Sequence, residues 1–255
     1  MKKVYAVSGS ASGIGKAVAV MLAAEGHKVI GIDIKKGDII ADLSTPKGRT
    51  ECITRLCEQA SGGLDGFIPC AGVGGHLGLS DQVIEVNYCG SVDLIEGALP
   101  LLKKRRGTVV IIGSNSMAIP GIDERLIQLM LHGDFQQAKV RSKQFAFDPY
   151  AAAKTALCIW MRKKAIETIS EGVRINAIAP GMTETGMVAA QRESSVELAG
   201  VLNEFAVSAP IGYAAEPEVI AGVIGFLLSS ASSFVVGEVL YADGGHAAQF
   251  RPEHV

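Results

Sequence analysis

Short runs of apolar, often β-branched residues alternate with helical patterns along almost the whole chain. Each run is apolar at consecutive positions, as in strands that are buried on both faces of a sheet. Alternation with helices is typical of parallel strands joined by right-handed crossovers. We therefore predict an α/β fold with one doubly wound parallel sheet flanked by helices. The predicted strands are Val4 to Val7, Lys28 to Asp33, Gly66 to Cys70, Thr108 to Ile112, Val173 to Ala179 and Val239 to Ala242.

Length and charge limit the domain count and the class of partner. With 255 residues, 48% of them hydrophobic, the chain can bury one sizeable core, so we predict a single domain over residues 1–255. The formal net charge is −2 and the basic residues are scattered. Because nucleic acids and anionic lipids attract concentrated positive charge, this pattern argues against a nucleic-acid or membrane partner.

The N-terminal sequence, the length of the apolar stretches and the cysteines indicate a cytoplasmic protein. The start, Met-Lys-Lys followed by the strand at Val4, lacks the features of a signal peptide. The longest apolar stretch, Val219 to Leu228, is interrupted by Gly222 and Gly225 and is too short for a membrane span. Five cysteines, with no Cys-x-x-Cys pair and no adjacent histidine cluster, favour free thiols and no metal site.

A glycine-rich segment lies between the first predicted strand and the first predicted helix. It reads Gly9-Ser-Ala-Ser12-Gly13-Ile14-Gly15, and the helix should begin near Ile14. Small residues allow a tight turn and close approach of a pyrophosphate, whose negative charge is favoured by the amides at a helix start. Taken alone, the motif could also be an ordinary turn. Its position between strand and helix favours a dinucleotide site.

Two further segments could contact the adenosine half of a dinucleotide. Asp33 ends the second strand, where a carboxylate accepts hydrogen bonds from ribose hydroxyls and repels a 2′-phosphate. Ile34 follows it, which favours NAD, although Lys35 and Lys36 are close enough to leave NADP open. Asp42 and Leu43 either lie beside adenine or form a polar cap on the next helix. Spacing does not distinguish these two roles.

A tyrosine and a lysine share one face of a predicted helix. Tyr150 and Lys154 are four residues apart in an alanine-rich segment. A free tyrosine titrates near pH ~10, and a neighbouring ammonium favours its phenolate, so the pair could perform acid–base chemistry. Such pairs are common by chance. Ser114 adds support, since it follows a predicted strand at the sheet edge where α/β folds bind ligands, although it could equally be a turn residue.

The order of these motifs resembles the short-chain dehydrogenases/reductases. The resemblance spans almost the whole chain and implies a Rossmann-type sheet and a soluble oxidoreductase. Its subgroup segments, such as Gly31-Ile-Asp33-Ile and Thr183-Glu-Thr185, are similar to those of bacterial 3α-hydroxysteroid dehydrogenases/carbonyl reductases. The matching features are the glycine-rich turn, Asn87 after Val86, Ser114, the Tyr150/Lys154 pair, Pro180-Gly181 with Thr183, and Asp243-Gly244-Gly245.

The resemblance implies a role for each matching residue. Tyr150 would exchange a proton with the substrate oxygen, Ser114 would hydrogen-bond that oxygen, and Lys154 would hold the nicotinamide ribose. Asn87 would anchor a proton-relay water, and Thr183 would bind the nicotinamide carboxamide. The residues expected to bind NAD are Gly9, Ser12, Gly13, Ile14, Gly15, Asp33, Asp42, Leu43, Ala71, Gly72, Tyr150, Lys154, Pro180, Gly181 and Thr183.

Two segments depart from the pattern common to the family. Pro69-Cys70-Ala71-Gly72 stands where many members have Asn-Asn-Ala-Gly, which would keep the backbone contact but lose the asparagine side chains. The interval before Tyr150 is longer than usual, and about residues 118–148 should form a helical insertion over the site and beside the following helix. In the subgroup such an insertion blocks a tetramer interface, so a homodimer through another surface is expected. The alternative is a tolerated surface elaboration.

The segment of about residues 182–208 is expected to form an apolar substrate lid, suited to a bulky substrate such as a steroid, although it could also be ordinary helix core. We expect His76 and His246 to be structural or incidental. The leading hypothesis is an NAD-dependent oxidoreductase of hydroxysteroids and other carbonyl compounds. The alternatives are a dehydrogenase of a smaller aryl, cyclic or sugar-derived alcohol and a redox-sensing binding protein, which the intact catalytic residues disfavour.

Overall fold

Seven parallel strands form one sheet in the part of the chain that the computed structural model describes, residues 2–74, 80–144 and 149–253. The strand order is β3-β2-β1-β4-β5-β6-β7. All six predicted strands are present, and no strand end differs from its predicted position by more than one residue, so the predicted fold class is confirmed. The bounds are β1 Val4–Ser8, β2 Lys28–Asp33, β3 Ile39–Ile40, β4 Gly66–Pro69, β5 Thr108–Ile112, β6 Arg174–Pro180 and β7 Val239–Ala242.

Strand β3 was not predicted. It pairs only two residues with the end of β2, Ile39 with Ile32 and Ile40 with Asp33. A strand this short shows no periodicity in a sequence, because two residues cannot establish an alternation. The pairing exists because the chain passes the edge of β2 on its way to the next helix.

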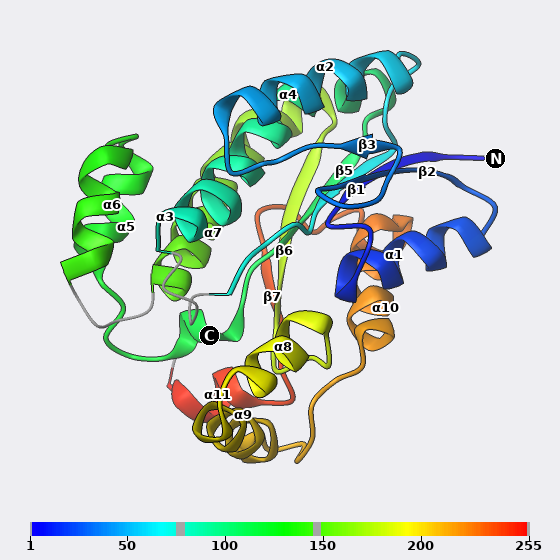
Figure 1. Cartoon of the computed structure of the whole chain (residues 1–255). Helices are drawn as coiled ribbons and strands as arrows, with labels where there is room; N and C mark the ends of the chain where they lie inside the picture. The colour runs from blue at the N-terminus through cyan, green and yellow to red at the C-terminus, as the bar shows by residue number, and fades with distance from the viewer. Residues whose placement is uncertain (1, 75–79, 145–148, 254–255) are drawn as a thin grey trace.

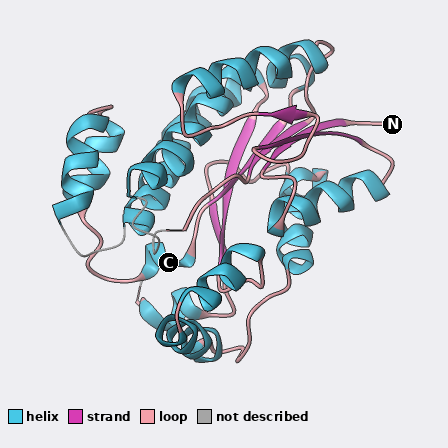
Figure 2. Ribbon diagram, viewed as in Figure 1, coloured by secondary structure: helices cyan, strands magenta, loops and turns pink. Residues whose placement is uncertain are grey.

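Helices cover both faces of the sheet (Figures 1 and 2). One face packs against helices α2, α4 and α7, and the other against α1 and α10. Alternate residues of β5 enter different cores: Val109 and Ile111 face the first group of helices, and Val110 and Ile112 face the second. The helix bounds are α1 Gly13–Ala24, α2 Pro46–Gln59, α4 Ser91–Arg105, α7 Pro149–Thr168 and α10 Pro217–Leu228.

The predicted insertion contains two helices, α5 (Glu124–Leu131) and α6 (Phe135–Gln144). Asp134 caps α6, since its carboxylate accepts a hydrogen bond from the amide of Gln137 at 3.2 Å. The apolar side chains of α5 are buried against α7, as expected. The expected position over the site is wrong for the described residues, because only Ile119 of this segment lines the cleft. Figure 1 shows both helices at the side of the molecule.

Three further helices gather beyond the carboxyl ends of the strands, at the bottom of Figure 1. They are α8 (Gly186–Ser194), α9 (Val196–Ser208) and α11 (His246–Phe250). The shorter elements are α3 (Ser80–Gln82), the π-helix η2 (Val83–Gly90) and the 3₁₀ turns η3 (Asn115–Ala118), η4 (Ile169–Glu171) and η5 (Ser230–Ser232). In the described residues, no helix has both the length and the apolar character that crossing a bilayer requires.

Candidate active site

A cleft of about 810 Å³ opens at the carboxyl ends of the central strands. This is the edge at which parallel α/β sheets bind ligands, because loops from several strands converge there. The cleft brings together residues that are far apart in sequence. Every predicted site residue except Asn87 lines it: Gly9, Ser12, Gly13, Ile14, Gly15, Asp33, Asp42, Leu43, Ala71, Gly72, Ser114, Tyr150, Lys154, Pro180, Gly181 and Thr183.

The glycine-rich turn can exist only with glycine at two positions. Gly9 has φ +69°, and a side chain there would meet the backbone of Ala71 at 2.9 Å. A Cβ on Gly15 would lie 2.3 Å from the carbonyl oxygen of Gly9. Both contacts are with backbone, which cannot move aside. The turn therefore packs directly under the loop after β4, and both segments form one wall of the cleft.

The start of α1 suits an anionic group. Ser12, the N-cap residue, makes no capping hydrogen bond through its side chain, and the first turn contains no acidic residue. The first amides of a helix have no partner within the helix, and the helix dipole adds positive potential there. Because this end of α1 opens into the cleft, its amides can receive a pyrophosphate.

Asp33 connects the end of β2 to the glycine-rich turn. Its carboxylate accepts hydrogen bonds from the amides of Ala11 at 3.1 Å and Lys35 at 2.9 Å. These bonds fix the carboxylate at the cleft, which Lys35 also lines. The fixed negative charge can accept hydrogen bonds from vicinal hydroxyls and opposes a phosphate at the same place.

The structure answers part of the question about Asp42 and Leu43. Thr45 caps α2, since its hydroxyl accepts the amide hydrogen of Gly48 at 3.0 Å. Asp42 instead accepts hydrogen bonds from the hydroxyl and amide of Ser44, and these bonds lower the pKa of its carboxyl. Asp42 is therefore not the helix cap, and both it and Leu43 line the cleft.

Asn87 is buried behind the cleft in the π-helix η2. Its side chain forms two hydrogen bonds with Val73: Oδ1 accepts from the amide and Nδ2 donates to the carbonyl, both at 2.9 Å. A π-helix is uncommon and often occurs at functional sites. Here Asn87 holds the loop after β4 in place, so its side chain supports the cleft wall without lining it.

Ser114 stands at the end of β5 with its hydroxyl in a defined orientation. Its Oγ accepts hydrogen bonds from the amide of Ser116 at 3.2 Å and from the Ser116 hydroxyl at 3.0 Å. With its lone pairs occupied in this way, the Ser114 hydroxyl is left to donate. A donor at the carboxyl end of a central strand can bind an oxygen atom in the cleft.

Tyr150 and Lys154 lie in the first turns of α7, on the face that meets the cleft. The ammonium of Lys154 is 5.6 Å from the centre of the Tyr150 ring and donates to the carbonyl of Ile112 at 2.8 Å. Lys154 is only 5% exposed, and burial lowers its pKa. One of its three donors is used by β5, so the other two remain for groups in the cleft.

The loop after β6 closes the cleft on the remaining side. Gly181 packs against Asp243 so closely that a side chain would lie 2.7 Å from its Cα. Thr183 donates its hydroxyl hydrogen to the carbonyl of Gly181 at 3.0 Å and is 5% exposed. These contacts hold the loop at the end of the sheet, beside Ser114 in the same cleft.

Residues of the predicted lid line the cleft, but most of them carry no motif that could identify them in advance. Gln191 and Ile119 were predicted only as parts of the lid and the insertion, since neither has a distinctive neighbour in the sequence that would single it out. Cys70 also lines the cleft, and burial raises the pKa of its thiol to about 12, so it stays protonated at neutral pH. The apolar side chains of the lid in the cleft are Met182, Met187, Val201, Leu202 and Phe205.

The described residues contain no group of three or more His, Cys, Asp or Glu side chains that could hold a metal ion. The described lining of the cleft offers a phenol, an ammonium and a serine hydroxyl beside a helix start that suits an anion. That set can move a proton to or from an oxygen atom of a bound molecule.

Family models and known proteins match the chain over nearly its whole length. Residues 3–123 match the short chain dehydrogenase model, and residues 134–247 match a model described as enoyl-(acyl carrier protein) reductase. The 3-alpha-hydroxysteroid dehydrogenase/carbonyl reductase of Comamonas testosteroni is 38% identical over 98% of both chains. The cis-4-hydroxycyclohexanecarboxylate dehydrogenase of Sinomonas cyclohexanicum is 31% identical over 97% of both chains.

Solved structures agree with the sequence matches. The 3-alpha-hydroxysteroid dehydrogenase of Pseudomonas sp. B-0831, crystallised with NADH, has a TM-score of 0.93 and 38% identity, covering 99% of this chain and 100% of that chain. Levodione reductase has a TM-score of 0.77 and 29% identity, covering 96% and 98%. From its fold, its cleft and these matches, the chain belongs to the short-chain dehydrogenase family and is an oxidoreductase.

Proposed function

We propose that this protein is an NAD(H)-dependent oxidoreductase that interconverts 3α-hydroxysteroids, or other bulky secondary alcohols, and their ketones. The observation that carries the proposal is the meeting of Ser114, Tyr150 and Lys154 in one cleft with the glycine-rich turn. Two relatives at 38% identity are named as 3-alpha-hydroxysteroid dehydrogenases, and one of them was crystallised with NADH.

The side chains divide the work at the substrate oxygen. Bound nicotinamide would supply the hydride acceptor for alcohol oxidation. Tyr150 takes the hydroxyl proton in that direction and returns it in the other, because the ammonium of Lys154 favours the charged phenolate. Ser114 donates a hydrogen bond to the same oxygen and stabilises the charge that develops on it. The side chain of Asn87 is bonded to Val73 outside the cleft, so Asn87 would take part in proton transfer only through a relay water that leads to solvent.

Cofactor binding follows from the cleft wall. The amides at the start of α1 hold the pyrophosphate, and Asp33 accepts the hydroxyls of the adenosine ribose. Asp42 and Leu43, which line the cleft, would lie beside adenine. Lys154 holds the nicotinamide ribose with its two remaining donors, and Thr183 binds the carboxamide.

The size and lining of the cleft support a bulky, weakly polar substrate. Side chains of α8 and α9 form part of the wall of this cleft of about 810 Å³. The side chains that these helices contribute are mostly apolar, and burying apolar surface favours a steroid-like ligand. A second candidate is a smaller cyclic alcohol, which the relative named for cis-4-hydroxycyclohexanecarboxylate supports.

We further propose a cytoplasmic homodimer. The five cysteines are free thiols, in keeping with a reducing compartment. On α10, Val219, Gly222 and Phe226 form an exposed stripe at helical spacing, with Val219 60% and Phe226 43% exposed. A second copy related by twofold symmetry would cover this stripe on both chains at once.

The substrate proposal predicts oxidation of 3α-hydroxysteroids with NAD. A panel of 3α-hydroxysteroids, cyclic alcohols and simple secondary alcohols, followed by NADH absorbance, tests it. We expect the steroids to give the highest kcat/KM, because they fill the apolar wall of the cleft. Rapid oxidation of small cyclic alcohols without turnover of any steroid would support the second candidate instead.

The catalytic assignment predicts that Tyr150→Phe lowers kcat by about a thousandfold or more, because general acid–base catalysis contributes 10²–10⁴-fold. NADH should still bind with unchanged Kd, measured by fluorescence titration. Tyr213→Phe, at an exposed tyrosine outside the cleft, is the matched control and should keep full activity. Substantial activity in Tyr150→Phe would show that another group donates the proton.

Cofactor selection depends on the charge of Asp33. Asp33→Asn removes that charge while keeping an acceptor oxygen, so the KM for NADP should fall by about tenfold, because removing a like charge near the phosphate recovers more than ~1 kcal/mol. Lys35, on the same wall, should assist. Glu58→Gln makes the same charge change on the exposed face of α2 and should alter neither the KM for NAD nor the KM for NADP. An unchanged NADP preference in Asp33→Asn would contradict the assignment.

The dimer proposal predicts that Phe226→Lys produces monomers, because the charge would be buried without a partner at the centre of the interface. Mass by light scattering across a concentration series measures this. Ile166→Lys is the matched control: Ile166 is 70% exposed on α7, away from the stripe on α10, and that variant should stay dimeric. A monomeric wild-type protein, or dissociation by Ile166→Lys alone, would contradict the proposal.

A further inference from the structure

His246 is a fully buried histidine that the proposed mechanism does not use. It begins α11, directly after Asp243-Gly244-Gly245. It does not line the cleft, yet it contacts elements that do. A buried polar ring normally has its hydrogen-bonding groups satisfied, so the identity of its partners indicates what the ring holds together.

The partners of His246 form a chain of hydrogen bonds in which the donors all point the same way. Nδ2 of Asn115 lies 3.2 Å from Nδ1 of His246, and Nε2 of His246 lies 3.0 Å from Oγ of Ser208. An amide nitrogen can only donate, so Nδ1 must accept and Nε2 must carry the hydrogen. The Ser208 hydroxyl in turn donates to the carbonyl of Phe205 at 2.9 Å. This hydrogen-bond chain therefore requires the neutral Nε2–H tautomer of His246.

Each end of this chain meets a wall of the cleft. Asn115 directly follows Ser114 and lines the cleft itself. Ser208 ends α9, whose Phe205 also lines the cleft. The His246 ring contacts Phe205 with ring centres 4.5 Å apart. One imidazole thus connects the loop that carries Ser114 with the helix that forms the substrate wall.

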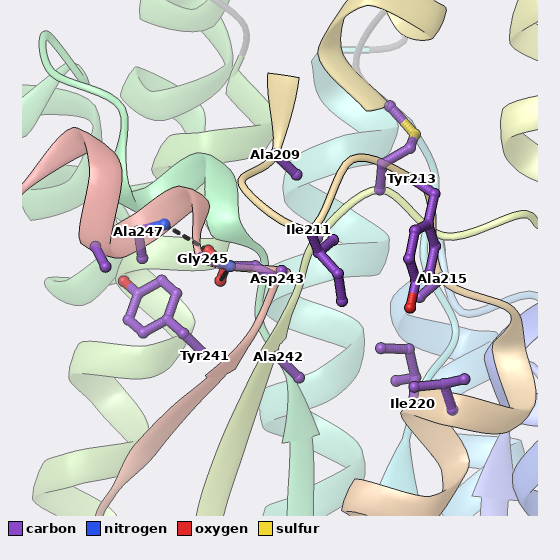
Figure 3. A pocket seen from close by; sticks show the side chains of 15 residues that line it. Ala209, Ile211, Tyr213, Ala215, Ile220, Tyr241, Ala242, Asp243, Gly245 and Ala247 are labelled. Carbon is purple, nitrogen blue, oxygen red and sulfur yellow. Dashed lines mark hydrogen bonds between the residues drawn. The ribbon is translucent and has the colours of Figure 1, made fainter. Parts of the chain in front are cut away.

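The preceding turn fixes the direction of the ring. Asp243 accepts hydrogen bonds from the amides of Gly245 at 3.1 Å and Ala247 at 2.7 Å, one on each side of His246. Gly244 and Gly245 have φ +66° and +97°, which favour glycine. Figure 3 shows this turn along one side of a second pocket of about 480 Å³. The backbone is therefore shaped to send the next side chain inward.

We propose that His246 is a positioning residue that sets the width of the substrate pocket by tying α9 to the Ser114 loop. In this role it determines how well a bulky substrate is held, and it does not touch the reacting atoms. The proposal rests on the proposed function only in assuming that the cleft receives substrates of different size. It extends that function by naming the group that fixes the pocket wall.

Two variants separate the hydrogen bonds from the packing. His246→Phe keeps an aromatic ring beside Phe205 but loses both hydrogen bonds. Ser208→Ala removes the link between His246 and α9, together with the Ser208–Phe205 bond inside α9. Ser208 is exposed, so this variant should fold even if the buried substitution does not. Ser208→Thr restores the hydroxyl. Asn203→Ala, at another exposed polar residue of α9, is the matched control.

We expect the KM of the bulkiest substrate to rise about three- to tenfold in His246→Phe and Ser208→Ala, the range that losing a hydrogen bond produces. The KM of the smallest alcohol and the Kd of NADH should stay within about twofold of wild type, the scatter allowed for substitutions away from a contact. Ser208→Thr and Asn203→Ala should behave as wild type. An equal change for small and bulky substrates, or no change for either in Ser208→Ala, would overturn the proposal.

A measurement without turnover tests the hydrogen-bond chain itself. In ¹⁵N-histidine-labelled protein, the two ring-nitrogen resonances of His246 can be assigned as those missing from His246→Phe, or through their coupled ring protons. We expect these resonances to show a neutral Nε2–H ring at neutral pH. A charged ring, or a proton on Nδ1, would refute the chain. If the wild type oxidises no alcohol, the proposed function fails, and the tautomer still decides whether His246 joins α9 to the loop.

Discussion

The parallel arrangement of the strands is the constraint on which the rest of this structure depends. Parallel strands place all their carboxyl ends at one edge, so the loops that follow β1, β2, β4, β5 and β6 converge there. Apart from the short connection between β2 and β3, the crossovers contain helices, and these helices bury both faces of the sheet. The same requirement that makes the strands apolar therefore also collects the polar side chains at one end.

Within that edge, the polar groups are held mainly by backbone. Lys154 is anchored by a carbonyl of β5, Asp33 by two amides and Asn87 by both backbone groups of Val73. Backbone partners move little, so each side chain keeps a fixed orientation without depending on another mobile side chain. Such preorganisation is what an active site requires when charge develops on a substrate oxygen.

The substrate side of the cleft is built differently. Helices α8 and α9 are more exposed than the central helices and belong to neither large core. Their position depends on a small number of contacts, such as the ion pair between Arg192 and Glu184 and the contact of Phe205 with His246. Segments with few buried contacts open more easily than a core. The cofactor wall is therefore part of the large cores, whereas the substrate wall lies outside them and depends on contacts such as that of His246.

The sequence by itself determined the sheet, the glycine-rich turn and the tyrosine–lysine pair, because each depends on local spacing: strands on consecutive apolar residues, the turn on glycine, and the pair on helical periodicity. Tertiary structure alone decided that Asn87 bonds Val73, that the described part of the insertion does not cover the cleft, and that His246 has partners on two other elements. These contacts join residues far apart along the chain, and no local pattern encodes a distance between segments that only folding brings together. His76 lies outside the described residues.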